Sequence, residues 1–355
     1  MVNDRPRSGN ITTPNDSERV SSVAGLVKSQ VDDLPPAFGG TYGQNTEAVR
    51  RQILRATHDW LARSPSPFTR TSYALDLRQF LVHVGAFADE MEHLITVRPG
   101  HIAAWRDALQ EQGLTNATIR RKLTSIRSLF SYLQTYGYMG ANPAHGKFVK
   151  APSVARDGKT VGLSSQDCRR LMDAPDPETP VGKRDRAMLA ILAYTGCRVG
   201  ELVRLKVSSY RTSGGHHLLT VMGKGMKERN VPLHPEAFER LLEWMECAAI
   251  RDEVSRPLFR PSLTSRGRGF DGFAQRPMSR RSVEFLVARY VHGLGLDPNI
   301  TVHSFRVTAL TTARERGADI IDLQDYAGHA DPRTTLTYIR SRDRLSKSPA
   351  YLLTY

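Results

Sequence analysis

The sequence predicts a mainly α-helical protein of two domains, with a small antiparallel β-sheet in the second domain. Apolar residues recur every three or four positions through most of residues 46–136, which is the period of an amphipathic helix. Three short strand-like segments follow between residues 207 and 233, and a Gly-Lys-Gly turn joins the last two. A chain of 355 residues with 40% hydrophobic content can fill two cores.

Residues 1–44 are rich in Ser, Asn, Asp, Pro and Gly, and we expect them to be mostly disordered. The first 20 residues contain no apolar core of the kind found in a secretory signal. This segment is too polar to form a separate folded DNA-binding module.

Four helices are predicted in residues 45–144, each with an apolar stripe that faces a shared core. Proline, glycine and capping residues mark their ends. The helices run from Thr46 to Ser64, from Thr69 to Gly85, from Pro99 to Gln112 and from Thr115 to Tyr136. The fourth carries basic residues that we expect on its outer faces, namely Arg120, Arg121, Lys122 and Arg127. Such a cluster is either an ordinary solvated face or a surface for nucleic acid.

Residues 145–161 are predicted to form a basic linker, since Asn142-Pro143 ends the helical pattern. The linker contains Gly158-Lys159-Thr160, which resembles the end of a phosphate-binding loop. That motif requires glycine at position 153, where this chain has Ser153, and no apolar strand precedes it. Nucleotide binding is therefore not predicted.

A second domain is predicted from residue 162 to 341, followed by a C-terminal tail at 342–355. Its strands are expected at residues 207–210, 217–222 and 229–233. Helices are expected at Asp185–Tyr194, His234–Ala248 and Ser279–Leu294, and residues 251–277 are expected to be a basic surface insertion.

The composition favours a nucleic-acid partner. The formal net charge is +14 and the isoelectric point is near 9.9, so the surface attracts polyanions with a marked salt dependence. No apolar run approaches the roughly 20 residues that a membrane span requires. The three cysteines fit neither a disulfide framework nor a zinc site. We expect a cytoplasmic protein with no membrane partner.

The stretch from Thr301 to Arg340 contains the densest set of candidate functional residues. His303 and Arg306 are three positions apart, so they share a face of a helix that Gly317 would end. Asp319 is a candidate N-cap for the next helix, which would end at Gly328-His329. A third helix would present Tyr338, nine positions after His329. These groups suit a phosphate better than a metal.

This segment resembles the C-terminal signature of the tyrosine recombinases (the lambda-integrase and Xer class), which is H-x-x-R followed by G-H and then Y. Two upstream segments are also similar to that family. Thr195–Leu202 (TGCRVGEL) resembles its first arginine motif, and Gly223–Arg229 (GKGMKER) resembles its lysine hairpin. Four motifs in the right order are more specific than any one of them.

The resemblance implies an N-terminal four-helix core-binding (SAM-like) domain that closes over one side of a DNA duplex, plus a C-terminal tyrosine-recombinase catalytic domain. It implies that the catalytic residues are Tyr338, Arg198, Lys224, His303, Arg306 and His329. Glu201 would orient Arg198 or pack the fold. Lys227 would either compete with Lys224 for the proton-donating role or contact DNA. The other residues expected to contact DNA are Arg120, Arg121, Lys122 and Arg127.

These residue types suit phosphoryl transfer without a metal or another cofactor. A phenol has a pKa near 10, so Tyr338 needs neighbouring groups that favour the phenolate or accept its proton. Arg198 and Arg306 can each grip non-bridging phosphate oxygens and stabilise the charge of the transition state. His303 can exchange protons near neutral pH, and His329 can hydrogen-bond the phosphate. The 3′-phosphotyrosyl link retains the energy of the ester, so rejoining needs no ATP.

We therefore expect a site-specific DNA recombinase that acts on double-stranded DNA as a homotetramer across two synapsed sites. A mobile-element integrase is favoured because of the long polar N-terminus and the basic insertion. The alternatives are an Xer-like chromosome or plasmid dimer resolvase, a relaxing topoisomerase of the same chemistry, and a catalytically silent DNA-binding protein. A metal-dependent nuclease is disfavoured, since the sequence shows no carboxylate cluster. Val307 and Ala327 depart from the usual family pattern.

Overall fold

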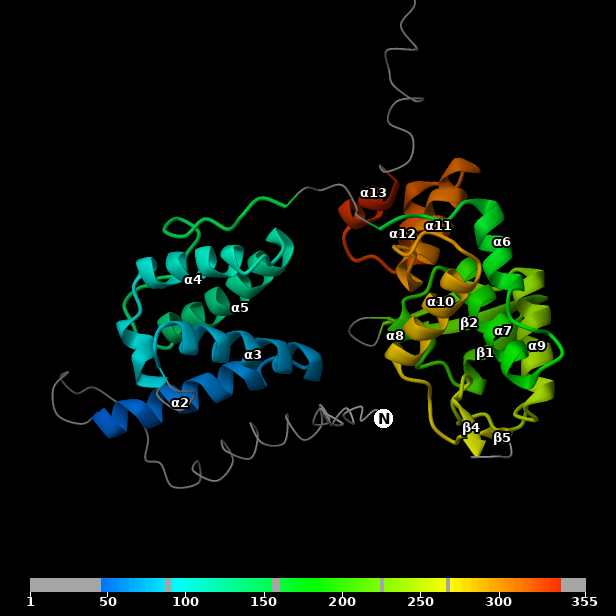
Figure 1. The fold of residues 1–355 in the computed structure, drawn as a ribbon, viewed down its shortest axis with the longest axis horizontal. Coiled ribbons are helices and arrows are strands. Elements are labelled where there is room, and N and C mark those ends of the chain that lie inside the picture. Colours follow the sequence, from blue (N-terminus) through cyan, green and yellow to red (C-terminus); the bar gives the residue numbers. More distant parts are fainter. Residues whose placement is uncertain (1–45, 87–90, 155–159, 224–226, 266–268, 340–355) are drawn as a thin grey trace, which may run out of the picture. The chain divides into compact units, whose positions relative to one another are not determined.

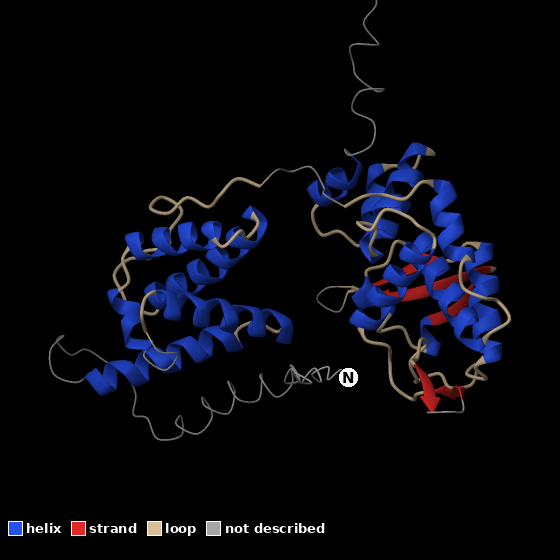
Figure 2. Ribbon diagram, viewed as in Figure 1, coloured by secondary structure: helices blue, strands red, loops and turns tan. Residues whose placement is uncertain are grey.

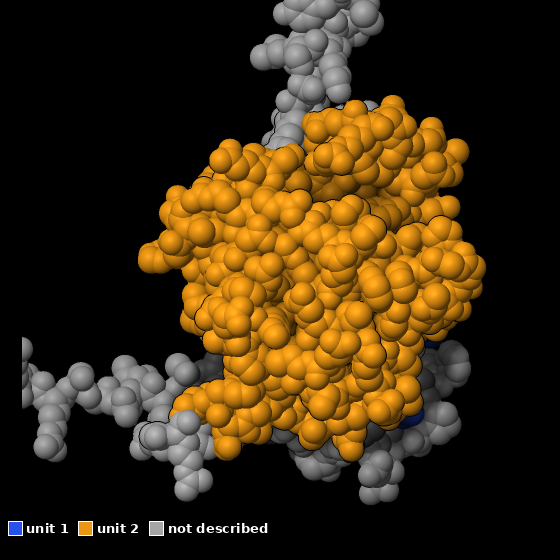
Figure 3. Space-filling view, turned by 90° about the vertical axis from the view of Figure 1, so that its right-hand side faces the viewer, with its two compact units in different colours: residues 1–154 blue, residues 155–355 orange. Residues whose placement is uncertain are grey.

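The computed structural model describes residues 46–86, 91–154, 160–223, 227–265 and 269–339 (Figure 1). The chain divides into two compact units, residues 1–154 and residues 155–355, and Figure 3 shows one face of the second. The expectations for residues 1–44 and for the tail at 342–355 lie outside the described residues.

The first unit is a helical bundle, as the apolar periodicity predicts. Ser66 and Thr115 cap two of its helices, since their hydroxyl oxygens accept hydrogen bonds from Thr69 N and Thr118 N. Proline in the first turn also begins two helices. The helices are α2 (Thr46–Ala62), α3 (Pro67–His83), α4 (Pro99–Glu111) and α5 (Asn116–Thr135), with a 3-10 helix, η1, at Met91–Thr96.

Aromatic side chains hold this bundle together. Phe80 is fully buried and makes edge-to-face contacts with Trp105 and Phe130. Trp60 donates a hydrogen bond through Nε1 to Ser128 Oγ, which joins α2 to α5. The residues that face the core are therefore those of the predicted stripes.

The basic run of α5 needs a correction, because Lys122 does not lie on an outer face. Lys122 is 7% exposed, and its ammonium donates to Asp76 Oδ1 and to Gln79 Oε1 on α3. Arg121 donates both Nη atoms to the carboxylate of Asp76. Two backbone carbonyls, those of Ala144 and Val149, accept from Arg127. Arg120 is exposed.

The second unit combines helices with two small sheets (Figure 2). It begins with α6 (Ser165–Asp173), α7 (Pro180–Thr195), α8 (Val199–Leu202) and the 3-10 helix η2 (Val207–Ser209). Next come β1 (Tyr210–Ser213), β2 (His216–Met222), β3 (Glu228–Pro232), α9 (Pro235–Cys247), β4 (Ser262–Ser265) and β5 (Gly269–Phe273). The last helices are α10 (Arg280–Gly293), α11 (Val302–Glu315), α12 (Ile320–Ala327) and α13 (Pro332–Ile339).

The three-stranded sheet is antiparallel in the order β1-β2-β3. Leu219 in the central strand pairs with Tyr210 on one side and with Val231 on the other. The strand predicted at 207–210 is wrong in its position, because residues 207–209 form a 3-10 turn and the strand begins at Tyr210. The turn arises where the N–H groups of Val207 and Ser208 bond carbonyls of residues 254–256, so the chain bends before it enters the sheet.

Helix α7 is the central element of this unit. Its residues from Met188 to Leu192 are fully buried, and it packs against α9, α11 and α6. The carboxylate of Asp185 on α7 accepts from Arg184 and from the hydroxyl of Tyr290 on α10. Helix α7 therefore positions the turn that follows Thr195.

The segment 251–277 is not a surface insertion. Leu258 and Phe259 are buried in the main core, and β4 pairs with β5 in an antiparallel hairpin. Trp244 donates to Leu258 O and meets Phe273 edge-on. The basic residues of the segment gave it a surface-like composition, although Leu258 and Phe259 belong to the core.

We expect Asp76→Ala to lower the free energy of unfolding of the first unit by about 3–5 kcal/mol, because it leaves the buried Lys122 ammonium without its carboxylate partner. Urea denaturation followed by hydrogen exchange on peptides of this unit measures the change.

Asp107→Ala is the matched control, since Asp107 forms an exposed pair with its neighbour Arg106. It should leave the free energy of unfolding close to that of wild type. An equal loss in both variants would contradict the structural role of Asp76. Replacing Asp76 and Lys122 together by apolar residues should recover much of the loss.

Candidate active site

The turn between α7 and α8 presents Arg198. Gly196 ends α7 in the left-handed conformation with φ 55°, and a Cβ at this position would lie 3.3 Å from the Cβ of Ala309. The hydroxyl of Thr195 accepts from Cys197 N, which holds the turn. Arg198 then stands at the N-cap of α8 with its side chain 40% exposed. The side chain can therefore reach both solvent and a ligand.

The carboxylate of Glu201 lies between two arginines. It accepts from Arg198 N at 2.9 Å, from Arg198 Nη1 at 2.7 Å and from Arg229 Nη2 at 2.8 Å. Glu201 is 2% exposed, and burial alone would raise its pKa. The hydrogen bonds from Arg229 and Arg198 outweigh burial and lower the pKa to about 2. Glu201 is thus a buried anion that is hydrogen-bonded to Arg198.

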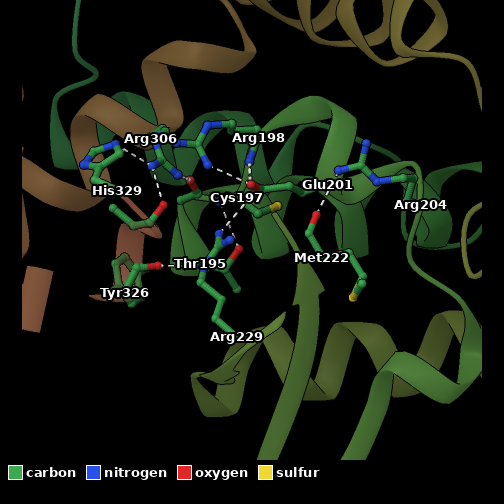
Figure 4. Close-up of polar contacts among 12 residues, drawn as sticks. Thr195, Cys197, Arg198, Glu201, Arg204, Met222, Arg229, Arg306, Tyr326 and His329 are labelled. Atoms are coloured by element: carbon green, nitrogen blue, oxygen red, sulfur yellow. Dashed lines mark hydrogen bonds and ion pairs between the residues drawn. The ribbon is translucent and has the colours of Figure 1, made fainter. Parts of the chain in front are cut away.

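Arg306 is a buried cation that joins three segments. It is 1% exposed, and its Nη1 donates to Gly196 O at 2.7 Å. Its Nη2 donates to Ala327 O at 2.5 Å and to His329 Nε2 at 2.7 Å (Figure 4). Gly196 and Ala327 stand at the C-terminal ends of α7 and α12, where helix carbonyls carry partial negative charge. The guanidinium therefore fixes both helix ends beside Arg198.

Arg229 is a residue of the site that the sequence analysis did not assign. Its Nε donates to Tyr326 O at 3.0 Å, and its Nη2 donates to Glu201. Tyr326 is the residue before Ala327, whose carbonyl accepts from Arg306. Gly328 has φ 61°, and a Cβ there would lie 3.0 Å from Arg229 Nη1. The lysine-hairpin motif contained Arg229 at its last position, but motif spacing gave no sign that it reaches α12. Arg229 ties the hairpin to the turn that carries His329.

His329 is buried and lies in a hydrogen-bonded turn. Its N–H donates to Gln324 O, and Gln324 Nε2 donates to His329 O at 3.1 Å. Its ring Nδ1 lies 2.9 Å from Thr335 Oγ1 on α13. Burial, together with the charges of Arg306, Arg198 and Arg229, lowers the pKa of His329 to about 4. The imidazole is therefore neutral at pH 7.

His303 stands in the first turn of α11 and keeps an exposed edge. Partial desolvation, with the positive charges of Arg306 and Arg198, lowers its pKa below the ordinary value. Both histidines thus respond to the same pair of arginines. A neutral imidazole near an arginine pair can accept a proton while the arginines hold an anion.

The structure brings together five of the residues predicted from sequence: Arg198, Glu201, His303, Arg306 and His329. Tyr338 belongs to α13, which packs against α11 and α12, and the structure describes its backbone only. Lys224 lies outside the described residues. Lys227 is exposed at the base of the hairpin, where its carbonyl accepts from Gly223 N at 2.8 Å. The basic residues of α5 belong to the other unit and are not placed relative to this site.

The described residues include neither a metal site nor a helix that could span a membrane. Within the described ranges, no group of three or more His, Cys, Asp or Glu residues has the arrangement of a metal site. None of the helices that the structure describes has the length and apolar character to cross a bilayer. The site is a cluster of guanidinium groups beside neutral imidazoles, an arrangement that can hold and polarise a phosphate.

We expect Glu201→Gln to destabilise the second unit by about 3 kcal/mol at pH 7, because the pKa of the folded carboxyl is about 2 and its ordinary value is 4.5. A depressed pKa stabilises the fold above pH 4.5, and this contribution is lost as the pH falls toward 2. Urea denaturation of wild type and variant, followed by hydrogen exchange in this unit, should show curves that converge over that range. The exposed Glu228→Gln is the control, and a Glu201→Gln difference independent of pH would contradict the assignment.

Comparisons with known proteins agree with this geometry. Residues 162–344 match the model of the phage integrase family, and residues 57–137 match the N-terminal SAM-like domain of phage integrases. The tyrosine recombinase XerC of Pelobacter propionicus is 34% identical over 290 residues, which cover 80% of this chain and 88% of that relative.

Two solved structures share the fold. A XerH recombinase bound to a palindromic difH substrate has a TM-score of 0.62 at 19% identity and covers 89% of this chain and 91% of its own. A lambda integrase tetramer bound to a Holliday junction has a TM-score of 0.61 at 17% identity and covers 89% of this chain and 87% of its own. The family match spans more than half of the chain and includes every candidate catalytic residue, so this chain belongs to the phage integrase family, the tyrosine recombinases.

Proposed function

We propose that this protein is a site-specific DNA recombinase that cleaves and rejoins DNA through a 3′-phosphotyrosyl intermediate. The observation that carries the proposal is the contact set of Arg306, which joins His329 to the turn of Arg198 and to the end of α12. Helix α13, which bears Tyr338, follows three residues after His329. A phosphate held by these groups would lie close to a tyrosine of the chain.

The proposed reaction exchanges one phosphoester for another. The phenolic oxygen of Tyr338 attacks the phosphorus, a bond to that oxygen forms, and the bond from phosphorus to the sugar 5′-oxygen breaks. Arg198 and Arg306 stabilise the charge on the non-bridging oxygens, because both are cations held in place before the substrate arrives. Rejoining is the reverse step, with a 5′-hydroxyl as the attacking group.

Two protons move in this step. The phenol loses its proton to His303, whose lowered pKa keeps the imidazole neutral at pH 7. The departing 5′-oxygen takes a proton from Lys224, in the role implied by the family motif. Arg229 supports this assignment, since it fixes β3 at the end of the hairpin against α12. Lys227 is the competing donor and is exposed at the same turn.

The proposed partner is double-stranded DNA, and the proposed assembly is a homotetramer on two synapsed sites. The net charge of +14 supports binding to a polyanion. Solved relatives of the same fold are a tetramer on a Holliday junction and a complex with a recombination-site substrate. In the first unit, Arg120 and Arg121 are the exposed members of the predicted DNA-contacting set, whereas Lys122 and Arg127 serve the interior.

Dimer resolution is a second candidate beside mobile-element integration. The integrase hypothesis rested partly on a surface insertion at 251–277, and Leu258 and Phe259 of that segment lie in the core of the unit. A XerC relative that matches over 88% of its own length favours the resolvase alternative. Sequencing the DNA that becomes covalently attached to the protein distinguishes them. Attachment beside its own gene supports an integrase, and attachment at one distant chromosomal site supports a resolvase.

We expect wild type to form a covalent adduct with nicked DNA duplexes in EDTA, and Tyr338→Phe to form none, because the phenolic oxygen is the proposed nucleophile. A denaturing gel with labelled DNA measures the adduct. Tyr326→Phe is the control, since the Tyr326 hydroxyl donates to Tyr194 O in the interior. Loss of the adduct in Tyr326→Phe, with retention in Tyr338→Phe, would reassign the nucleophile.

We expect the cleavage rate to be flat from pH 8 to about 6.5 and to fall only below that range, because the pKa of His303 lies below its ordinary value. Protonation of His303 removes the proposed proton acceptor. Single-turnover rates on a nicked substrate measure the profile. His303→Gln should be slower by about 10²–10⁴-fold and should lose this acid limb. A wild-type rate that already falls between pH 8 and 7 would rule out a base with this lowered pKa.

A further inference from the structure

A buried hydrogen bond joins the histidine turn to the helix that bears Tyr338. His329 Nδ1 and Thr335 Oγ1 are 2.9 Å apart, and the two residues are 7% and 0% exposed. Thr335 precedes Tyr338 by three positions on α13, so the two residues lie one helical turn apart. A contact that fixes Thr335 therefore also restricts the position of the Tyr338 backbone.

The partners of His329 determine which ring nitrogen carries the proton. A guanidinium has donors and no acceptor, so His329 Nε2 must accept from Arg306 at 2.7 Å. The pKa of about 4 makes the ring neutral, so its single proton is on Nδ1. Nδ1–H then donates to the hydroxyl of Thr335. In this state Nε2 carries no proton and cannot donate to a phosphate oxygen.

We propose that Thr335 is a positioning residue that lets His329 exchange tautomers and couples this exchange to the helix of Tyr338. The inference rests on the proposed function, in which a phosphate binds between Arg306 and His329. To donate to that phosphate, Nε2 gains one proton from water, Nδ1 releases one to water, and the Arg306 N–H that Nε2 had accepted donates to the phosphate instead. Nδ1 then needs a donor, and the hydroxyl of Thr335 rotates to provide it.

The chemistry of the hydroxyl carries this role. A threonine hydroxyl both accepts and donates, so it satisfies Nδ1 in either tautomer without movement of the backbone. Carbonyl acceptors would stabilise only the Nδ1–H form. The contact also joins two segments that carry proposed reacting groups. The same hydrogen bond therefore affects both how His329 binds a phosphate and where α13 lies.

The adjacent residue Thr334 provides a matched comparison. It belongs to the same helix and is exposed, whereas Thr335 is fully buried. Sequence alone does not separate the two threonines. Their different burial assigns the histidine contact to Thr335.

We expect Thr335→Val to slow single-turnover cleavage by roughly ten- to a hundredfold, which corresponds to leaving one buried hydrogen-bonding group without a partner. Thr335→Ser, which keeps the hydroxyl, should stay within a few-fold of wild type, and Thr334→Val should match wild type. The affinity for the nicked duplex should be unchanged in Thr335→Ser and Thr334→Val. Hydrogen exchange in α7 and α11 checks that each variant is folded.

A spectroscopic readout tests the exchange of tautomers itself. In protein labelled with ¹⁵N-histidine, His329 is assigned by difference from His329→Gln. We expect the Nδ1–H form in the free protein and the Nε2–H form in Tyr338→Phe bound to the nicked duplex. In Thr335→Val, binding of the duplex should leave the population of the Nε2–H form reduced.

Several outcomes would overturn the inference. These are full cleavage by Thr335→Val, a defect in Thr335→Ser as large as in Thr335→Val, or an Nε2–H form in the free protein. If wild type forms no adduct, the proposed function fails, and the histidine spectra then decide the inference alone. An unchanged tautomer on DNA binding would reject it.

Discussion

The second unit depends on one buried guanidinium. Arg306 donates to two carbonyl oxygens and to a neutral imidazole, and both carbonyls stand at helix ends. The partial negative charge of the helix ends stabilises the cation. Arg306 thereby fixes the positions of α7, α12 and His329.

A second constraint follows from placing several cations close together. Glu201 is the carboxylate that makes this concentration tolerable, since it is buried between Arg198 and Arg229 and remains ionised. Burial and the positive charge of the arginines lower the pKa of both histidines, which are therefore neutral at pH 7. Fixed arginines thus supply charge, and neutral imidazoles supply proton exchange and hydrogen bonds. This division of roles matches a reaction in which charge develops on phosphate oxygens while a phenol loses a proton.

In the first unit, a buried carboxylate and basic residues stabilise the packing of two helices. Asp76 is buried and accepts from Arg121, Lys122 and Ser125, so part of the basic run of α5 is spent on holding two helices together. Net charge alone therefore overstates the surface that can meet DNA. Arg121 remains partly exposed beside Arg120, and these two retain the capacity to contact a phosphate backbone.

The sequence by itself determined the helices and the family, because capping residues, apolar spacing and the four motifs are local patterns. Asp319 caps α12 as predicted, and Thr115 caps the helix that was predicted to begin there, whereas α3 begins at Pro67 and not at Thr69. Only the tertiary structure showed that Lys122 points inward, that Arg229 reaches α12 and that Thr335 contacts His329. Each of these contacts joins separate helices or strands, two of them 46 and 97 positions apart in the chain. Local patterns specify which segments become helices, whereas the packing of those segments decides which polar groups share a buried site.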